Sequence, residues 1–379
     1  MSQNEKIEYI RRRFDNEELF YKIGSRQIHY VMPENATQIN TFYLPTFTEG
    51  APLRVYFDPT YRCNLRCRHC ITSSSPDAVN TNELSFQRIQ QLFNELASIG
   101  VLEIVFTGGE PFILPRIFDI IKCAQDAGLN TIIASNGTLI TMEKAKKLAE
   151  LNVRDIRISI DGWKPINDDI RGVGAYKMAI EGLKNLLLTE VPVSVRMTHR
   201  KNIHNNLEYL FKDLNEVGIT NLKAAVIKEA GNALLEENSD LLGYLPTEKA
   251  MHHLITLGKR YGIFVELSSD DFDFEPVIEG DKKLRKNRHN TCGAGFETAY
   301  ISPEGNVLIC SSIPHAILGN IKDCLFIDVW EGQIANNYRS QATACGEKKA
   351  CRINFINILP QSKTTIEEKS DNPVQGTVK

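Results

Sequence analysis

The chain has 379 residues, 42% of them hydrophobic and 24% charged, which is the composition of an ordinary globular protein. Its net charge of −3 gives no reason to expect nucleic acid or an anionic membrane as a partner. No run approaches about 18 apolar residues and the charged N-terminus lacks a signal-peptide core, so we expect a cytoplasmic protein without a transmembrane helix.

The first fifty residues predict a separate N-terminal unit, a helix and β-hairpin segment over 1–50. Residues 19–23 and 28–32 alternate apolar and polar side chains on either side of a Gly24-Ser25 turn. Such alternation around a turn is typical of two antiparallel strands.

From Arg54 onward, strand and helix patterns alternate. The expected strands are 54–58, 103–107, 130–135, 156–161, 191–197 and 221–227. Amphipathic helical stretches separate them at about 85–98, 115–127, 141–151, 175–188 and 203–217. Repeats of this kind form parallel βα units. Because six units are short of the eight in a closed barrel, the sequence predicts an α/β fold with a partial (βα)6 TIM-type barrel over 51–270.

Three of the nine cysteines, Cys63, Cys67 and Cys70, follow the first of these strands in a C-x3-C-x2-C pattern. Cytoplasmic thiols stay reduced, so clustered cysteines indicate metal rather than disulfides. Three thiolates can hold three irons of a cubane cluster and leave the fourth iron open for a small molecule. A zinc site or structural thiols are the alternatives, although zinc loops usually present C-x2-C pairs and four ligands.

Polar clusters also follow the next three strands of the predicted barrel. They are Gly108, Gly109, Glu110 and Pro111 after the second strand, Ser135 and Asn136 at the end of the third, and Ser159 and Asp161 at the end of the fourth. The carboxyl ends of parallel strands meet at one mouth, where barrel active sites form. We therefore expect all these residues to lie near the cysteine loop.

The sequence CNLRCRHC followed by TGGEP resembles the radical S-adenosylmethionine (SAM) enzymes over residues 52 to about 230. The resemblance implies a 4Fe–4S cluster on Cys63, Cys67 and Cys70, with SAM chelating the open iron. It implies that the GGEP segment contacts the SAM amino group, and that the polar residues ending the third and fourth strands contact its methionyl part or ribose. The residue before the third cysteine is His69, where the family often has a bulkier aromatic that packs on adenine.

Two arginines extend this predicted cofactor site. Arg171, in DDIRGVG, matches a short motif found after the fourth strand in many family members, and Arg196 lies on the fifth strand. Either guanidinium can pair with a carboxylate of SAM or of the substrate. A structural role for each arginine is the alternative.

The last quarter of the chain contains most of the remaining cysteines. The segment from Cys292 to Cys310, with Gly305 in a turn, is similar to the opening half of the twitch and SPASM extensions, which hold auxiliary 4Fe–4S clusters. Ala342 and Phe355 stand where the full SPASM pattern has cysteines, so we expect one auxiliary cluster within 280–358. The most economical ligand set is Cys292, Cys310, Cys345 and Cys351, with Cys324 as an alternative ligand. Cys123 reads as a core residue, and 359–379 as a disordered tail.

The resemblance implies that reductive cleavage of SAM gives a 5′-deoxyadenosyl radical, which abstracts hydrogen from the substrate. A ribosomally synthesised precursor peptide is the favoured substrate, with oxidative cross-linking, excision or epimerisation as the outcome. A flavodoxin or ferredoxin would supply electrons. The hairpin can bind a leader by strand addition or merely cap the barrel, and a separate leader-recognition protein is expected. A small-molecule dehydrogenase or epimerase of the same family and a non-enzymatic iron–sulfur carrier are the alternatives.

Overall fold

The computed structural model describes most of the chain between residues 9 and 344. The described ranges are 9–14, 17–23, 28–31, 51–79, 82–200, 203, 206–228, 230–235, 248–267 and 293–344. The predicted tail, 359–379, lies outside them.

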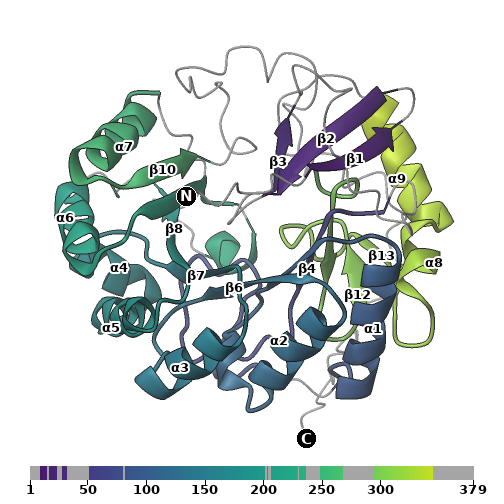
Figure 1. Ribbon diagram of the computed structural model, residues 1–379, viewed down its shortest axis with the longest axis horizontal. Coiled ribbons are helices and arrows are strands. Elements are labelled where there is room, and N and C mark those ends of the chain that lie inside the picture. The colour runs from purple at the N-terminus through teal and green to yellow at the C-terminus, as the bar shows by residue number, and fades with distance from the viewer. Residues whose placement is uncertain are drawn as a thin grey trace, which may run out of the picture.

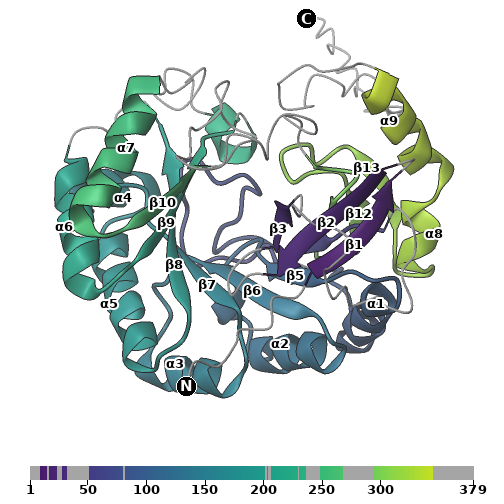
Figure 2. The ribbon, with the colours of Figure 1, turned by 45° about the horizontal axis from the view of Figure 1, so that its top comes forward.

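The N-terminal unit is a three-stranded antiparallel sheet in the order β1 (Tyr9–Phe14), β2 (Glu17–Ile23) and β3 (Ile28–Val31). Strands β2 and β3 form the expected hairpin. Residues Tyr9–Phe14 form a further strand, which pairs with β2 from end to end; the helix expected somewhere within 1–50 is not among the described residues of this segment. Figures 1 and 2 both show this sheet on the same side of the molecule as the C-terminal elements.

A curved ten-stranded sheet forms the body of the protein (Figure 1). Its first seven strands are parallel, and the first six of them match the predicted strands. They are β4 (Arg54–Phe57), β5 (Glu103–Phe106), β6 (Asn130–Ser135), β7 (Asp155–Ser159), β8 (Val193–His199), β9 (Asn221–Val226) and β10 (Phe264–Leu267). Strand β10 is a seventh parallel strand that the sequence pattern did not reveal, and it ends the sheet without closing a barrel.

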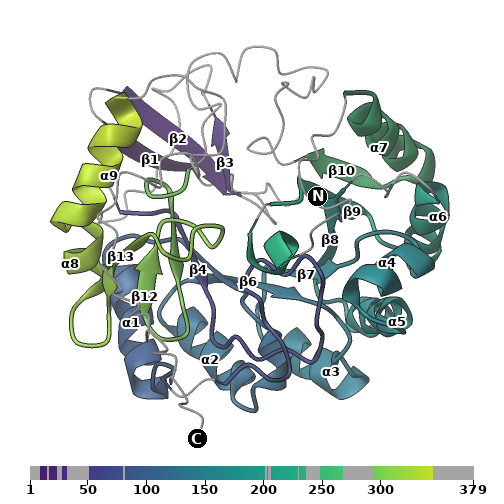
Figure 3. The same ribbon diagram turned by 180° about the vertical axis from the view of Figure 1, so that it is seen from behind.

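On the other edge, the sheet continues into the C-terminal region. Strand β11 (Thr298–Ile301) pairs in parallel with β4, and β12 (Asn306–Leu308) and β13 (Ile317–Asn320) follow it in antiparallel pairs. Figure 3 shows β12 and β13 beside helices α8 (Phe326–Trp330) and α9 (Gln333–Ala344). The partial barrel and the C-terminal region therefore share one continuous sheet.

The convex face of the sheet is covered by helices (Figure 1). They are α1 (Phe86–Ser98), α2 (Ile117–Asp126), α3 (Met142–Glu150), α4 (Lys164–Arg171), α5 (Ala175–Leu188), α6 (Leu207–Val217) and α7 (Glu248–Tyr261). Two 3-10 helices, η2 (Pro111–Ile113) and η4 (Gly231–Leu235), follow β5 and β9. Among the described residues, none of these helices is both long and apolar enough to span a bilayer.

The outer face of the strands is mainly apolar, whereas the inner face carries charged side chains beside apolar ones such as Val105 and Ile132. In β4, Val55 and Phe57 are fully buried in the core beneath the helices, whereas Arg54 and Tyr56 point the other way and are only partly buried. Side chains alternate between the two faces of a strand, so the positions in register with Arg54 and Tyr56 line the inside of the partial barrel, which we call the lumen. A closed barrel has a packed apolar interior. The charged lumen of this chain instead suits a polar ligand.

Candidate active site

The three cysteines of the predicted cluster follow β4 in one loop. Cys63 and Cys67 are buried, Cys70 is half-buried, and all three are free thiols. Burial raises the pKa of Cys63 to about 11 and that of Cys67 to about 12, and the neighbouring thiolates add to both shifts. Binding a metal cluster would therefore displace the protons of these thiols.

Hydrogen-bond donors point at the sulfur atoms of this loop. Cys63 Sγ accepts from the backbone N–H of Leu65 at 3.4 Å and from Asn136 Nδ2 at 3.8 Å. Cys70 Sγ accepts from the backbone N–H of Ser74 at 3.3 Å. Such bonds stabilise thiolates and set the reduction potential of an iron–sulfur cluster.

The donor set fits a cubane cluster better than a single metal ion. Among the described residues, no three His, Cys, Asp or Glu side chains converge on a point where one ion could sit. A cubane does not need such a point, because each thiolate binds a different iron. The three thiols of Cys63, Cys67 and Cys70 with their N–H donors can therefore hold three irons.

Two glycines let the end of β5 approach the cysteine loop closely. The N–H of Gly109 donates to the carbonyl oxygen of Thr60 at 2.8 Å, and the N–H of Glu110 to that of Arg62 at 2.9 Å. A Cβ on Gly109 would lie 2.0 Å from the Arg62 oxygen, and Gly108 has a positive φ of +88°. In this structure the glycines fit the loop itself, and their contact with SAM stays a prediction.

The carboxylate of Glu110 is fully buried and joins the ends of β5 and β6. Its Oε1 accepts from Ser135 Oγ at 2.9 Å and from the N–H of Phe112 at 3.1 Å, and its Oε2 accepts from the N–H of Asn136 at 2.8 Å. Burial raises its pKa, and these three bonds oppose the shift. Pro111, also buried, begins η2 directly after it. Both oxygens of Glu110 already accept hydrogen bonds from the protein, so a SAM amino group would have to share them.

Asp161, at the end of β7, is similarly occupied. Its Oδ1 accepts from the N–H of Thr198 at 2.8 Å, and its Oδ2 lies 2.7 Å from Arg171 Nε and 3.2 Å from His69 Nε2. Burial alone would raise the pKa of Asp161, but Arg171 and then His69 outweigh it and hold the pKa well below its usual range. The predicted contact with a ribose hydroxyl would likewise require a shared oxygen.

Arg171 lies between this carboxylate and the cysteine loop. Its Nη1 is 4.0 Å from Cys67 Sγ, so its charge faces both Asp161 and the thiol. Burial lowers its pKa, but Asp161 and Cys67 together raise it above the usual value. The described partner of Arg171 is therefore a carboxylate of the protein itself, and a contact with a carboxylate of SAM stays a prediction.

Ser159 and Arg196 lie side by side at the lumen. They are paired in register across β7 and β8, and both are half-buried. The structure therefore brings the predicted residues to one mouth but divides them into two groups. The first, around Glu110 and Asp161, is locked by protein hydrogen bonds, whereas the second, Ser159 and Arg196, faces the lumen.

Asn232 is a site residue that the sequence interpretation missed. From η4, its N–H donates to the carbonyl oxygen of Cys70 at 2.9 Å and its Nδ2 to that of Cys67 at 3.0 Å. It therefore ties the cysteine loop to η4. The rule that polar residues after strands meet at the mouth could have found it, because Asn232 follows the sixth predicted strand.

Only part of the predicted auxiliary cluster lies in the described residues. Cys310, after β12, is half-buried, and its Sγ accepts from the N–H of Ser312 at 3.4 Å. Cys324 is exposed, and its thiol donates to the carbonyl oxygen of Asn320 at 3.0 Å. The other three predicted ligands lie outside the described residues; they are Cys292, Cys345 and Cys351.

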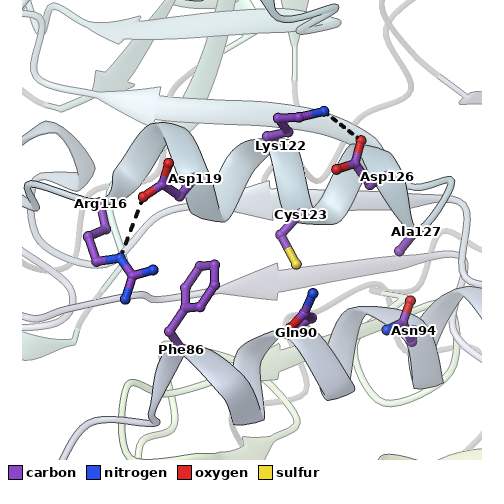
Figure 4. Close-up of a pocket in the computed structure, with 9 residues that line it drawn as sticks. All are labelled: Phe86, Gln90, Asn94, Arg116, Asp119, Lys122, Cys123, Asp126 and Ala127. Carbon is purple, nitrogen blue, oxygen red and sulfur yellow. Dashed lines mark hydrogen bonds and ion pairs between the residues drawn. The ribbon is translucent and has the colours of Figure 1, made fainter.

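Cys123 packs against the core as expected and also lines a surface groove of about 440 Å³ between α1 and α2 (Figure 4). The charges there are paired: Arg116 lies 3.5 Å from Asp119, and Lys122 lies 2.9 Å from Asp126. The groove is on the helical outside of the sheet, away from the cysteine loop. Its balanced charges give it no preference for an ionic ligand.

Comparisons with known proteins agree with the site. The sequence matches the radical SAM superfamily over residues 57–213 and an iron–sulfur cluster-binding domain, SPASM, over residues 292–353. It is 26% identical to an AdoMet-dependent heme synthase of Methanosarcina barkeri over 80% of this chain and 90% of that protein. It is 29% identical to the mycofactocin maturase MftC of Mycolicibacterium smegmatis over 80% of this chain and 77% of that protein.

The fold resembles solved structures of the same kind. Streptococcus suis SuiB bound to S-adenosylmethionine aligns with a TM-score of 0.65 over 81% of this chain and 75% of SuiB, at 16% sequence identity. SuiB bound to its precursor peptide SuiA aligns with a TM-score of 0.63 over 82% of this chain and 74% of SuiB. Together with the cysteine loop at the barrel mouth, these matches show that the chain is a radical SAM/SPASM enzyme, which binds a 4Fe–4S cluster with SAM and an auxiliary iron–sulfur cluster.

Proposed function

We propose that this enzyme matures a ribosomally synthesised peptide by hydrogen abstraction. The single observation that carries the radical step is the loop of three thiols at the barrel mouth with N–H donors aimed at two of its sulfurs. Cys63, Cys67 and Cys70 would hold the cluster, which would supply the electron for reductive cleavage of SAM and so allow hydrogen abstraction from the substrate.

The residues of the chain provide rigidity and shape around that chemistry. Glu110 and Asp161 each use both carboxylate oxygens to tie neighbouring strand ends together. Arg171 places a buried positive charge 4.0 Å from Cys67, where it offsets the negative charge of a thiolate-bound cluster. The lumen below holds the substrate, and its walls orient the target C–H bond.

A peptide substrate is supported by the relatives and by the N-terminal sheet. MftC is named as a maturase, and the SuiB structure contains a precursor peptide. Within the described residues, β1 and β3 are the outer strands of their sheet, so each has an edge that a leader peptide can extend by backbone pairing. We propose that one of these two edges, or a separate recognition protein, binds the leader peptide. We also propose that a flavodoxin or ferredoxin delivers the electron.

A small-molecule substrate is the second candidate. The relatives include an AdoMet-dependent heme synthase and an Fe-coproporphyrin III synthase, both of Methanosarcina barkeri. The partly exposed, charged lumen, with Arg54, Lys223 and Glu266 each about a quarter exposed, suits a polar small molecule as well as a peptide.

The test is anaerobic incubation of the reconstituted enzyme with SAM, dithionite and a candidate precursor peptide. We expect 5′-deoxyadenosine and a peptide whose mass falls by about two hydrogens for a cross-link, falls further for excision, or stays constant with solvent deuterium uptake for epimerisation. The triple variant Cys63→Ala, Cys67→Ala and Cys70→Ala should make no deoxyadenosine, whereas Cys123→Ala should match the parent enzyme. Deoxyadenosine from the triple variant would overturn the radical chemistry; coproporphyrin turnover without peptide change would favour the second candidate.

A further inference from the structure

A row of polar side chains crosses the lumen on four neighbouring strands. Ser159 of β7 pairs in register with Arg196 of β8, and Arg196 pairs with Lys223 of β9. Lys223 in turn pairs with Glu266 of β10. Paired residues on adjacent strands point to the same face of a sheet, so these four side chains meet on the lumen side.

The charges in this row do not cancel. Lys223 Nζ lies 2.6 Å from Glu266 Oε1, and each of these side chains is about a quarter exposed. Among the described residues, the half-buried guanidinium of Arg196 has neither a hydrogen bond nor an ion pair. Arg196 therefore leaves one positive charge without a carboxylate.

Each of three cations deeper in the lumen contacts a carboxylate, although only two carboxylates among the described residues serve them. Arg54 forms an ion pair with Glu103, which also lies 3.3 Å from Arg154. Arg157 lies 3.2 Å from Asp155. Because Glu103 serves two arginines, these deeper groups do not supply a spare negative charge for Arg196.

Tyr56 of β4 also lies on the lumen face, and positive charges act on its phenol. Burial alone would raise the pKa of its phenol, but nearby positive charges outweigh burial and lower it. Those charges belong to Arg54, Arg157, Arg196 and Lys223. The Tyr56 ring stacks on that of Tyr300, with centroids 5.2 Å apart, which fixes the position of the phenol.

We propose that Arg196, assisted by Lys223, is a subsite that binds a carboxylate of the substrate inside the lumen. A guanidinium binds a carboxylate through two parallel hydrogen bonds, and a partly buried site strengthens them. The inference rests on the function proposed above in taking the lumen as the substrate site. Arg171 is the cation beside the cysteine loop, with Nη1 4.0 Å from Cys67 Sγ, whereas Arg196 contacts none of the three cysteines among the described bonds.

Two sources can supply this carboxylate: a peptide, through its C-terminus or an acidic side chain, and a tetrapyrrole, through its propionates. Both would place a negative charge beside Arg196 and leave the rest of the molecule in the lumen. The chemistry recognised is the same, and matched pairs of charged and neutral probes separate the two sources.

Binding is measured anaerobically on the holoenzyme with SAM and without reductant, so that no turnover is needed. One probe pair is a peptide that contains Asp and has a free C-terminus, and the same peptide with Asn in place of Asp and an amidated C-terminus. The other is coproporphyrin III and its tetraamide. For at least one pair we expect the charged member to bind about tenfold more tightly, and this preference to disappear in Arg196→Gln.

Arg196→Lys should keep part of the preference, since it retains the charge but loses the second hydrogen bond. Arg116→Gln, the same change on the outer surface, should keep all of it. The proposal is overturned if neither pair shows a preference in the parent enzyme, if Arg196→Gln retains it, or if that variant lowers SAM affinity about tenfold and leaves the preference intact. Failure of deoxyadenosine formation would sink the proposed radical function without altering these binding ratios.

Discussion

Asp58, the residue directly after β4, has a fully buried carboxyl group, and neither of its oxygens has a hydrogen-bond partner in the part of the chain that the structure describes. Burial raises its pKa well above the usual value, and the nearby charge of Glu304 adds to the shift. Its side chain packs against Gly108, whose added Cβ would lie 2.8 Å from Asp58 Cβ. An ionised carboxylate in this position would be costly, so the folded protein favours the protonated acid.

This arrangement predicts how stability depends on pH. Because the folded-state pKa of Asp58 exceeds the unfolded one, the folded chain keeps a proton that the unfolded chain has lost, and stability falls as pH rises between the two values. Asp58→Asn removes this titration. The measured quantity is the difference between the unfolding free energies at about pH 8 and about pH 5, obtained by urea unfolding. We expect this difference to be about 1 to 2 kcal/mol more favourable to folding in Asp58→Asn than in the parent.

Asp126→Asn, on the exposed end of α2, is the matched control and should not change the pH dependence. The prediction is contradicted if the unfolding free energy of the parent rises steadily over the same pH range and that of Asp58→Asn rises equally. That result would mean that the Asp58 carboxylate is ionised and stabilised in the folded protein.

At the scale of elements, the approach of β5 to the cysteine loop depends on Gly109. A Cβ there would lie 2.0 Å from the Arg62 carbonyl oxygen, which is backbone and cannot move without the loop. Gly109→Ala should therefore displace the cysteines. We expect it to lose most of the iron bound at this site, measured as iron per chain and absorbance near 400 nm after anaerobic reconstitution.

Gly218→Ala is the control for backbone strain, because it strains the backbone without a steric clash. Gly218 ends α6 with a φ of +99° and has open space where a Cβ would be. Its substitution should cost about 1 kcal/mol of stability and no iron. Equal iron in Gly109→Ala and the parent would mean that the loop can accommodate the methyl group.

The two described cysteines of the C-terminal region give a second prediction. If Cys310 holds the auxiliary cluster, Cys310→Ser should lower the iron content from about eight to about four per chain. Cys324→Ser should leave it unchanged, since that thiol is exposed and donates to a carbonyl. A parent enzyme with only about four irons, or a loss of iron in Cys324→Ser, would contradict the ligand set proposed here.

Elements with a strong local signal could be predicted from the sequence, and those defined by tertiary pairing could not. The expected strand at 130–135 is β6, and the expected helix at 175–188 is α5, because each is long and strongly patterned. Helix α4 is short and mostly polar, and β10 is a four-residue edge strand that is recognisable only beside β9. Neither element is long enough to show a recognisable repeat of apolar and polar residues in the sequence.

The site shows the same division. The spacing of the cysteines and the order of the strands predict which residues gather at the mouth. The hydrogen bonds of Asp161 could not be predicted, because its partners come from three other elements: His69 in the cysteine loop, Arg171 in α4 and Thr198 in β8. Sequence patterns assign residues to a face or an edge, whereas partners distant in sequence follow only from packing.

At the scale of the whole molecule, the partial barrel and the SPASM region are joined by more than the shared sheet. Arg88 of α1 donates from Nε to the carbonyl oxygen of Ile321 at 2.7 Å and from Nη2 to that of Cys324 at 2.9 Å. Glu95, which lies 2.8 Å from Arg88, accepts from the N–H of Phe326 at 3.0 Å. One largely buried ion pair thus holds the start of α8 and the turn before it against α1.

This contact predicts that the two regions unfold together and that Arg88 couples them. Arg88→Gln leaves Glu95 without its cation and frees two carbonyl oxygens, so we expect a loss of about 2 to 3 kcal/mol in the unfolding free energy. Lys122→Gln, which breaks an exposed pair on α2, should cost less than about 0.5 kcal/mol. Hydrogen exchange should show faster exchange at both α1 and α8 in Arg88→Gln. Faster exchange confined to α8, or two separate transitions in the parent enzyme, would mean that the SPASM region folds independently of the barrel.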